Sequence, residues 1–242
     1  VNLTKSYFVI IIIAYFDTQR GGSMSENYNN IIETLDVIYA ASGGKLKVFL
    51  TRKKDDPYKG YWILPSDFLK NDETLDDKAM EIYQKTTSLS NGKISQSKIF
   101  SDLNRYPDRR IIAQSYFAIT DERLVTIKNE NEESAWFDTD ELPKLAYDHE
   151  AIILAVTKEV KTKIINNTDD ILLDFFPNDF TLPELQKFYE TVMGKKMDRR
   201  NFYKKFVSQD LVLDTGVKTT GSSGRPGVLY RFNVEKMRGK RV

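Results

Sequence analysis

Residues 62–89 read WILPSDFLKNDETLDDKAMEIYQKTTSL, and this stretch decides how the first half of the chain folds. It is predicted to begin as the end of a strand, to turn, and to continue as a helix from about residue 74 to residue 87. Asp72 or Thr74 can cap this helix, because a short side-chain oxygen accepts a hydrogen bond from an unpaired backbone amide. One helix face is predicted to pack on a core, since apolar residues recur at helical spacing: Leu75, Ala79, Ile82 and Tyr83.

This loop and helix resemble the Nudix box, G-x5-E-x7-R-E-U-x-E-E-x-G-U, in which U is a bulky apolar residue. Glu73 falls on the first Glu of the box, and Leu89 keeps the apolar residue at its end. The other positions differ from the pattern: Asp67 stands at the first Gly, Glu81 at the Arg, Ile82 at the first helix Glu, Lys85 and Thr86 at the Glu pair, and Ser88 at the last Gly. The resemblance therefore keeps the spacing and the apolar pattern of the box without its chemistry.

Loss of the box carboxylates argues against hydrolysis. Nudix hydrolases hold Mg²⁺ or Mn²⁺ against a pyrophosphate with clustered carboxylates, because hard cations need oxygen ligands. Ile82 and Thr86 cannot supply a carboxylate, and Lys85 places a positive charge where the metal would bind. Glu73 remains, with Glu81 available from a shifted register. We therefore expect no catalytic residue, no metal site and no cofactor in this chain.

The composition of the chain excludes several other kinds of functional site. At 242 residues, with 40% hydrophobic and 29% charged residues, the chain is long enough for two globular domains. It has no cysteine, which excludes disulfides, thiolate metal sites and cysteine nucleophiles. Its single histidine, His149, follows Asp148 at the start of a helix predicted to reach about residue 165, and we interpret it as a packing or hydrogen-bonding residue.

The C-terminal quarter is basic, although the whole chain has a net charge of only +1. Residues 181–242 contain 14 Lys and Arg against 6 Asp and Glu, so the remainder is net acidic. A basic segment attached to an acidic body is typical of a domain that binds a polyanion.

The same quarter has the order of elements of a winged helix-turn-helix. Thr181 and Glu184 form a predicted capping box, Gly194 ends the first helix, and Asp198 caps a second, basic helix over residues 199–208. A hairpin with a Gly- and Ser-rich tip follows, and the second helix of such a domain enters the major groove of DNA. The predicted DNA contacts are Arg199, Arg200, Asn201, Tyr203, Lys204, Lys205, Lys218, Arg225 and Arg231.

Taken together, residues 31–233 resemble the Nudix-related transcriptional regulators of bacteria. The segments that carry the resemblance are residues 62–89, 147–150, 180–186, 197–202, 224–226 and 229–232. The resemblance implies an α+β fold, with a Nudix-like α/β/α sandwich around a mixed sheet and a C-terminal winged helix-turn-helix domain. It also implies a cytoplasmic homodimer that binds a double-stranded DNA operator and responds to a small effector, ADP-ribose or a sugar.

The chain is predicted to divide into a Nudix-like sensor domain at residues 31–146, connecting helices at 147–179 and the winged helix at 180–242. Residues 1–30 are interpreted as an extension with a mis-called start before Met24, because a purine-rich ribosome-binding site would encode Arg-Gly-Gly-Ser at residues 20–23. A strand or hydrophobic arm is the alternative. The apolar run at residues 7–15 is too short to span a bilayer, so we expect no membrane association.

The effector is predicted to bind in the Nudix-like cleft, since arginines pair with phosphates and tryptophan stacks on bases. The predicted contacts are Arg52, Trp62, Glu73, Arg105, Arg109 and Arg110. Asp67 adds negative charge beside the expected pyrophosphate position, which keeps a neutral sugar or a sugar phosphate open. Two other functions also stay open: a nucleotide diphosphate hydrolase that uses carboxylates outside the box, and a ligand-binding adaptor whose winged helix contacts protein.

Overall fold

The computed structural model describes residues 31–42, 45–125, 134–166, 171–176, 179–219 and 226–238. The predicted N-terminal extension and its start at Met24 lie outside these residues, as does Arg225, one of the predicted DNA contacts. Within the described part, every helix is too short or too polar to cross a membrane.

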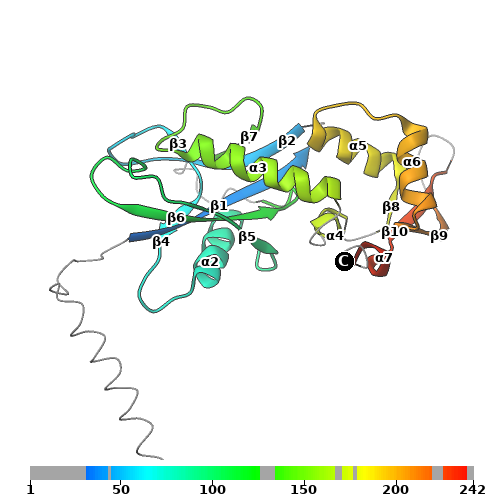
Figure 1. Cartoon of the computed structure of the whole chain (residues 1–242), viewed down its shortest axis with the longest axis horizontal. Coiled ribbons are helices and arrows are strands. Elements are labelled where there is room, and N and C mark those ends of the chain that lie inside the picture. The colour runs from blue at the N-terminus through cyan, green and yellow to red at the C-terminus, as the bar shows by residue number, and fades with distance from the viewer. Residues whose placement is uncertain are drawn as a thin grey trace, which may run out of the picture. The chain divides into compact units, whose positions relative to one another are not determined.

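A mixed seven-stranded sheet forms the first part of the structure (Figure 1). Its strands are β1 (Ile31–Ser42), β2 (Lys45–Arg52), β3 (Trp62–Ile63), β4 (Ser66–Phe68), β5 (Ile94–Phe100), β6 (Ile111–Ile119) and β7 (Ser134–Asp138). The main order is β3-β2-β1-β6-β5, with β4 paired to β1 and β7 paired to β2. β1 and β6 run parallel, whereas their other pairings are antiparallel. The predicted α+β class with a mixed sheet is confirmed.

Helices cover both faces of this sheet, with α2 (Leu75–Thr87) on one side and α3 (His149–Asn166) on the other (Figure 1). β1 shows why, because successive side chains of a strand point to opposite faces. Val37 and Tyr39 join the core cluster that contains the α3 residues, whereas Ile38 packs with Tyr83 of α2. The three layers of the predicted sandwich therefore follow from one strand that is apolar on both faces.

The start of α2 is fixed by Thr74, whose hydroxyl accepts a hydrogen bond from the Asp77 amide at 3.1 Å. This observation decides between the two predicted caps. Ser66–Phe68 pairs with β1 as strand β4, and the predicted turn follows at residues 71–72, directly before α2. Residues 140–143 form no helix, and the segment after them is held in extended form, because Trp62 exchanges backbone hydrogen bonds with Lys144 and Ala146.

The C-terminal part forms the predicted winged helix. Its elements are α4 (Ile171–Phe175), β8 (Phe180–Thr181), α5 (Leu182–Met193), α6 (Arg199–Ser208), β9 (Val212–Lys218), β10 (Val228–Phe232) and α7 (Val234–Arg238). The three strands form a sheet in the order β8-β10-β9. The capping box of Thr181 and Glu184, the Gly194 C-cap and the Asp198 N-cap are all confirmed. The short elements β8 and α7 were not predicted, whereas α4 lies in the segment predicted to form connecting helices.

An aromatic cluster holds α6 against α5. The ring of Tyr189 on α5 lies 5.4 Å from the ring of Phe202 and 5.5 Å from that of Phe206, both on α6. Phe202 and Phe206 are buried, four residues apart, so the opposite face of α6 is directed to solvent.

The buried Asp36 on β1 gives a first testable prediction. Neither of its carboxylate oxygens has a hydrogen-bond partner in the described part of the chain, and burial raises its pKa well above the usual value. The folded state therefore holds the Asp36 proton more tightly than the unfolded chain. Stability should fall as pH rises from about 4 through the folded-state pKa, by about 1.4 kcal/mol for each unit of elevation.

The variant Asp36→Asn should remove this loss, so its free energy of unfolding should rise relative to wild type between pH 4 and pH 8. Urea denaturation across this range measures the difference. Asp55→Asn, at an exposed carboxylate, is the matched control. Parallel pH profiles for wild type and Asp36→Asn would contradict the account.

Candidate functional site

A cleft with a cavity of about 290 Å³ opens beside the sheet, a volume at the small end of the range for ligand pockets. Its walls come from β1, the β2–β3 loop, β4, the β5–β6 loop and the start of α3 with the residues before it. The lining residues are Glu33, Lys53, Asp56, Pro57, Ile63, Ser66, Asp67, Phe68, Tyr106, Asp108, Arg109, Tyr147 and His149. Four carboxylates and two cationic side chains therefore face this space, together with three aromatic rings.

The wall behind the cleft is held by a buried ion network. The side chain of Arg105 is fully buried and donates a fork of two hydrogen bonds to Asp148, at 2.6 and 2.9 Å. It also reaches Glu33 at 3.3 Å, and Tyr106 donates to the other oxygen of Glu33 at 3.0 Å. Burial raises the pKa of Glu33, against the opposing effect of the Arg105 charge. The network ties β1 to the first turn of α3, and it places the Tyr106 ring at the cleft.

Two tyrosines line one side of the cleft, and a third, Tyr58, packs against one of them. Tyr106 and Tyr147 are stacked with centroids 4.0 Å apart, and Tyr58 meets Tyr147 edge-on at 5.0 Å. Tyr58 and Tyr147 have φ angles of 70° and 54°, in the left-handed region that non-glycine residues seldom adopt. Such strain is kept where surrounding structure enforces it and is common at binding sites. The stacked pair offers a flat surface for an aromatic or sugar ring.

His149 lies under this aromatic wall. Its Nδ1 accepts a hydrogen bond from the Leu64 amide at 3.0 Å, so in the neutral ring the proton is on Nε2, which has no partner in the described part of the chain. Burial lowers the pKa of His149 to about 4, and the ring is neutral at physiological pH. The expected packing or hydrogen-bonding role fits this position, and the structure adds that His149 lines the cleft.

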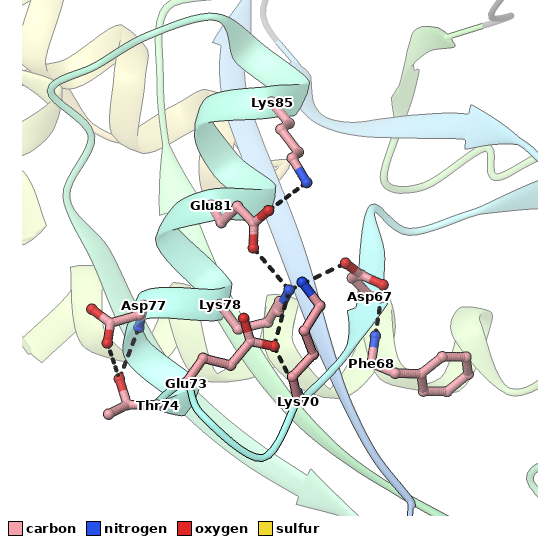
Figure 2. A network of polar contacts seen from close by, with 9 residues as sticks. All are labelled: Asp67, Phe68, Lys70, Glu73, Thr74, Asp77, Lys78, Glu81 and Lys85. Carbon is pink, nitrogen blue, oxygen red and sulfur yellow. Dashed lines mark hydrogen bonds and ion pairs between the residues drawn. The ribbon is translucent and has the colours of Figure 1, made fainter.

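The box helix carries a second cluster, centred on Lys78 (Figure 2). The Nζ of Lys78 lies 2.8 Å from Glu81, 3.0 Å from Glu73 and 3.3 Å from Asp67. Lys85 pairs with the other oxygen of Glu81. Hydrogen bonds, chiefly from Lys78, lower the pKa of Glu81 to about 2.

The residues of the box do not fit the divalent metal of Nudix hydrolases. In the described part of the chain, no three Asp, Glu or His side chains are grouped so that they could hold a metal ion. The box carboxylates surround an ammonium instead. A divalent cation about 4 Å from that ammonium would be repelled by about 8 kcal/mol at an effective dielectric constant of about 20.

The predicted effector contacts occupy different places. Arg109 lines the cleft, where it is exposed and pairs with Asp108. The other five predicted contacts do not line the cleft. Arg105 is buried in the ion network, and Arg110 binds the Asp102 carbonyl. Arg52 lies over the Trp62 ring at 4.6 Å. Glu73 accepts from the Lys70 amide and pairs with Lys78.

Sequence reasoning did not single out Lys53, Tyr106 or Tyr147 as cleft residues, nor Lys78 as part of the box cluster. Tyr147 belonged to a segment that carried the family resemblance, which was the available signal. Lys78 could have been found by its helical spacing from Ile82 and Lys85.

The outer face of α6 presents the predicted DNA contacts. Arg199, Arg200, Asn201 and Lys204 are exposed, and residues 199–208 include no carboxylate. The N-cap Asp198 accepts from the Asn201 amide at 2.8 Å, which fixes the start of the helix and the direction of these side chains. A rigid, basic helix face suits the major groove.

The other predicted DNA contacts differ in their exposure and in the partners they already have. Tyr203 is half-buried beneath Arg199, whose guanidinium lies 5.1 Å from the ring centre. Lys205 is half-buried, and Lys218 is exposed at the end of β9. Arg231 is exposed but donates to both oxygens of Asp179, at 2.8 and 3.2 Å. Their contacts with DNA stay predictions.

Comparison with known proteins agrees with this arrangement. Residues 172–232 match the family model described as the NrtR DNA-binding winged helix domain. The chain is 25% identical over 215 residues to the ADPR-responsive transcriptional repressor NtrR of Acinetobacter baylyi, covering 86% of this chain and 85% of that protein. It is also 29% identical over 107 residues to the ADP-ribose pyrophosphatase of Methanocaldococcus jannaschii, covering 44% of this chain and 63% of the relative.

Among solved structures, the fold is similar to that of Shewanella oneidensis NrtR complexed with a 27mer DNA. The TM-score is 0.71 at 24% sequence identity, and the match covers 86% of this chain and 95% of the other. The similarity extends over both the sheet with its helices and the winged helix.

Because His149 is the single histidine of the chain, its titration can be followed without assignment. A folded-state pKa of about 4, below the unfolded value of about 6.5, means that the unfolded chain binds this proton first. Stability should therefore be fully present above pH 6.5 and fall, by about 3 kcal/mol, as pH decreases toward 4.

The imidazole Hε1 NMR signal should stay constant from pH 8 to about pH 5. The variant His149→Asn, whose side-chain oxygen can replace Nδ1 as acceptor, should lack this contribution to the pH dependence of unfolding. A signal that titrates near pH 6.5 in the folded protein would show that the ring is neither buried nor held as described.

Proposed function

We propose that the chain is a Nudix-related transcriptional regulator with a C-terminal winged helix, and that it is a cytoplasmic homodimer which binds operator DNA through α6. We further propose that ADP-ribose in the Nudix-like cleft controls this binding. The observation that carries the DNA-binding part is the exposed, carboxylate-free face of α6, with Arg199, Arg200 and Asn201 in its first turn.

The chemistry of the cleft supports a sugar nucleotide as effector. The stacked rings of Tyr106 and Tyr147 suit an aromatic base or a ribose. Carboxylates such as Glu33 and Asp56 accept hydrogen bonds from ribose hydroxyl groups, and the cations Lys53 and Arg109 pair with phosphates. The relative from Acinetobacter baylyi is described as ADPR-responsive, which favours ADP-ribose over a simple sugar. The cleft contains more acidic than basic residues, which is less favourable for a pyrophosphate. A neutral sugar or a sugar phosphate, which carries fewer phosphate groups, is therefore the second candidate for the effector.

We propose that the cleft binds its ligand without hydrolysing it. The box positions that hold the metal in Nudix hydrolases are Ile82, Lys85 and Thr86 here, and the ammonium of Lys78 lies among the carboxylates that remain. This loss suits a sensor, because an effector that is not hydrolysed stays available to bind. A bound effector shifts the equilibrium between two DNA-binding states by the difference in its affinity for them. The similarity to a pyrophosphatase keeps hydrolysis as the alternative to be tested.

DNA binding is tested by fluorescence anisotropy on the DNA upstream of the protein's own gene, over a range of salt concentrations. Affinity should fall steeply with salt, because phosphate contacts release counterions. Arg200→Ala and Asn201→Ala should each weaken specific binding by about tenfold or more, as expected for side chains that contact base edges. Lys236→Ala, which removes an exposed charge from α7, is the control. Absence of binding to any DNA at low salt would defeat the proposal and favour the adaptor.

The effector is tested by adding ADP-ribose, ribose 5-phosphate or ribose to the protein–DNA complex. ADP-ribose should change DNA affinity, and Arg109→Ala should raise the concentration required by about tenfold, the effect of losing one charge-assisted phosphate contact. Arg123→Ala is the matched control, because Arg123 is likewise exposed and paired with a nearby aspartate but does not line the cleft. A response to ribose alone would move the effector to simple sugars, and equal responses of both variants would place the ligand elsewhere.

A further inference from the structure

Lys78 lies on the helix face that the Nudix pattern uses for metal binding. It precedes Ile82 by four residues and Lys85 by seven, so all three share one side of α2. In the pattern, the positions of Ile82 and Lys85 are metal-binding glutamates. The Lys78 side chain therefore extends from one turn earlier on that face, toward Asp67 of β4 and Glu73 of the segment before the helix (Figure 2).

The ammonium has the surroundings of a coordinated cation. Its three N–H groups match three carboxylates, from Asp67, Glu73 and Glu81, at 2.8 to 3.3 Å. The Lys78 side chain has 0% exposure, whereas those of Asp67 and Glu81 are 48% and 36% exposed. The carboxylates thus lie between the ammonium and the solvent.

We propose that Lys78 is a built-in cation that takes the place of the divalent metal in the Nudix-like domain of this protein. The inference rests on the proposed non-catalytic role of the domain and gives that role a physical cause. The ammonium joins Asp67 of β4 and Glu73 to Glu81 of the helix, as a metal would, yet it has no open position for water or a phosphate oxygen.

The spacing of the carboxylates agrees with this assignment. Oxygens at about 3 Å suit an ammonium, whereas Mg²⁺ and Ca²⁺ require oxygens at about 2.0 to 2.6 Å. The hydrogen bond to Glu81 raises the pKa of Lys78 more than burial lowers it, so the group stays charged at physiological pH. Lys78, with Lys85 on Glu81, therefore offsets part of the carboxylate charge without any exchangeable ion.

Removal of the ammonium should expose a latent metal site. In Lys78→Met, three carboxylates would face one another with only the Lys85 ammonium, on the outer oxygen of Glu81, as counter-charge. A divalent cation can relieve that repulsion after a shift of about 1 Å. We expect Mn²⁺ to raise the melting temperature of Lys78→Met by about 3 °C or more, and to leave wild type unchanged. The electron paramagnetic resonance signal of free Mn²⁺ should decrease on addition of the variant only.

Two further variants isolate the cause. Lys85→Met also removes one positive charge from α2, at a residue that pairs with Glu81. Lys78 stays in place in this variant, so Mn²⁺ should not stabilise it. Lys78→Met combined with Glu73→Gln should lose the response, since one ligand is gone.

These experiments use neither DNA nor ADP-ribose, so the proposal about Lys78 can fail while the proposed regulatory function stands. If Lys78→Met is unfolded alone but folds with Mn²⁺, the proposal is supported. It is overturned if wild type binds Mn²⁺ as tightly as the variant, if the folded variant shows no response, or if the variant stays unfolded with Mn²⁺ present.

Discussion

The fork between Arg105 and Asp148 is the interaction on which the rest of the sensor depends. Arg105 comes from a polar loop, yet its side chain is fully buried, and it joins Glu33 of β1 to the residue that precedes α3. Removing one partner of such a network leaves a buried charge uncompensated, which typically costs about 3 to 5 kcal/mol. The network places Tyr106 and Tyr147 on one side of the cleft, and it fixes the end of α3 that lines it.

α3 also connects this cleft with the DNA-binding part. Its first residue, His149, lines the cleft, and near its last turn the carbonyl of Ile164 accepts a hydrogen bond from the Tyr189 hydroxyl at 3.1 Å. Tyr189 in turn packs on Phe202 and Phe206 of α6. A change at the first turn of α3 therefore has a continuous packed route to the recognition helix, which an effector could use if it binds the two arrangements unequally.

Local signals predicted the elements well, because caps and periodicity act within a few residues. The Thr181–Glu184 capping box, the Asp198 cap and the paired Phe202 and Phe206 gave the winged helix from sequence. The cleft was harder to predict, since its residues come together only through long-range pairing. Arg105 was expected to meet phosphates, but sequence carries no sign that Glu33 and Asp148 would bury it. Lys78 was not predicted, because it falls in the seven positions between Glu73 and Glu81 for which the Nudix pattern specifies no residue.

The central claim is that the cleft binds its effector without a metal and without turnover. The most direct measurement is calorimetric titration with ADP-ribose in EDTA, followed by incubation of the complex with Mg²⁺ or Mn²⁺ and chromatography of the nucleotide. The account predicts reversible binding that EDTA does not weaken, and full recovery of intact ADP-ribose after incubation with either metal. Metal-dependent release of AMP and ribose 5-phosphate would contradict it and identify the domain as a hydrolase.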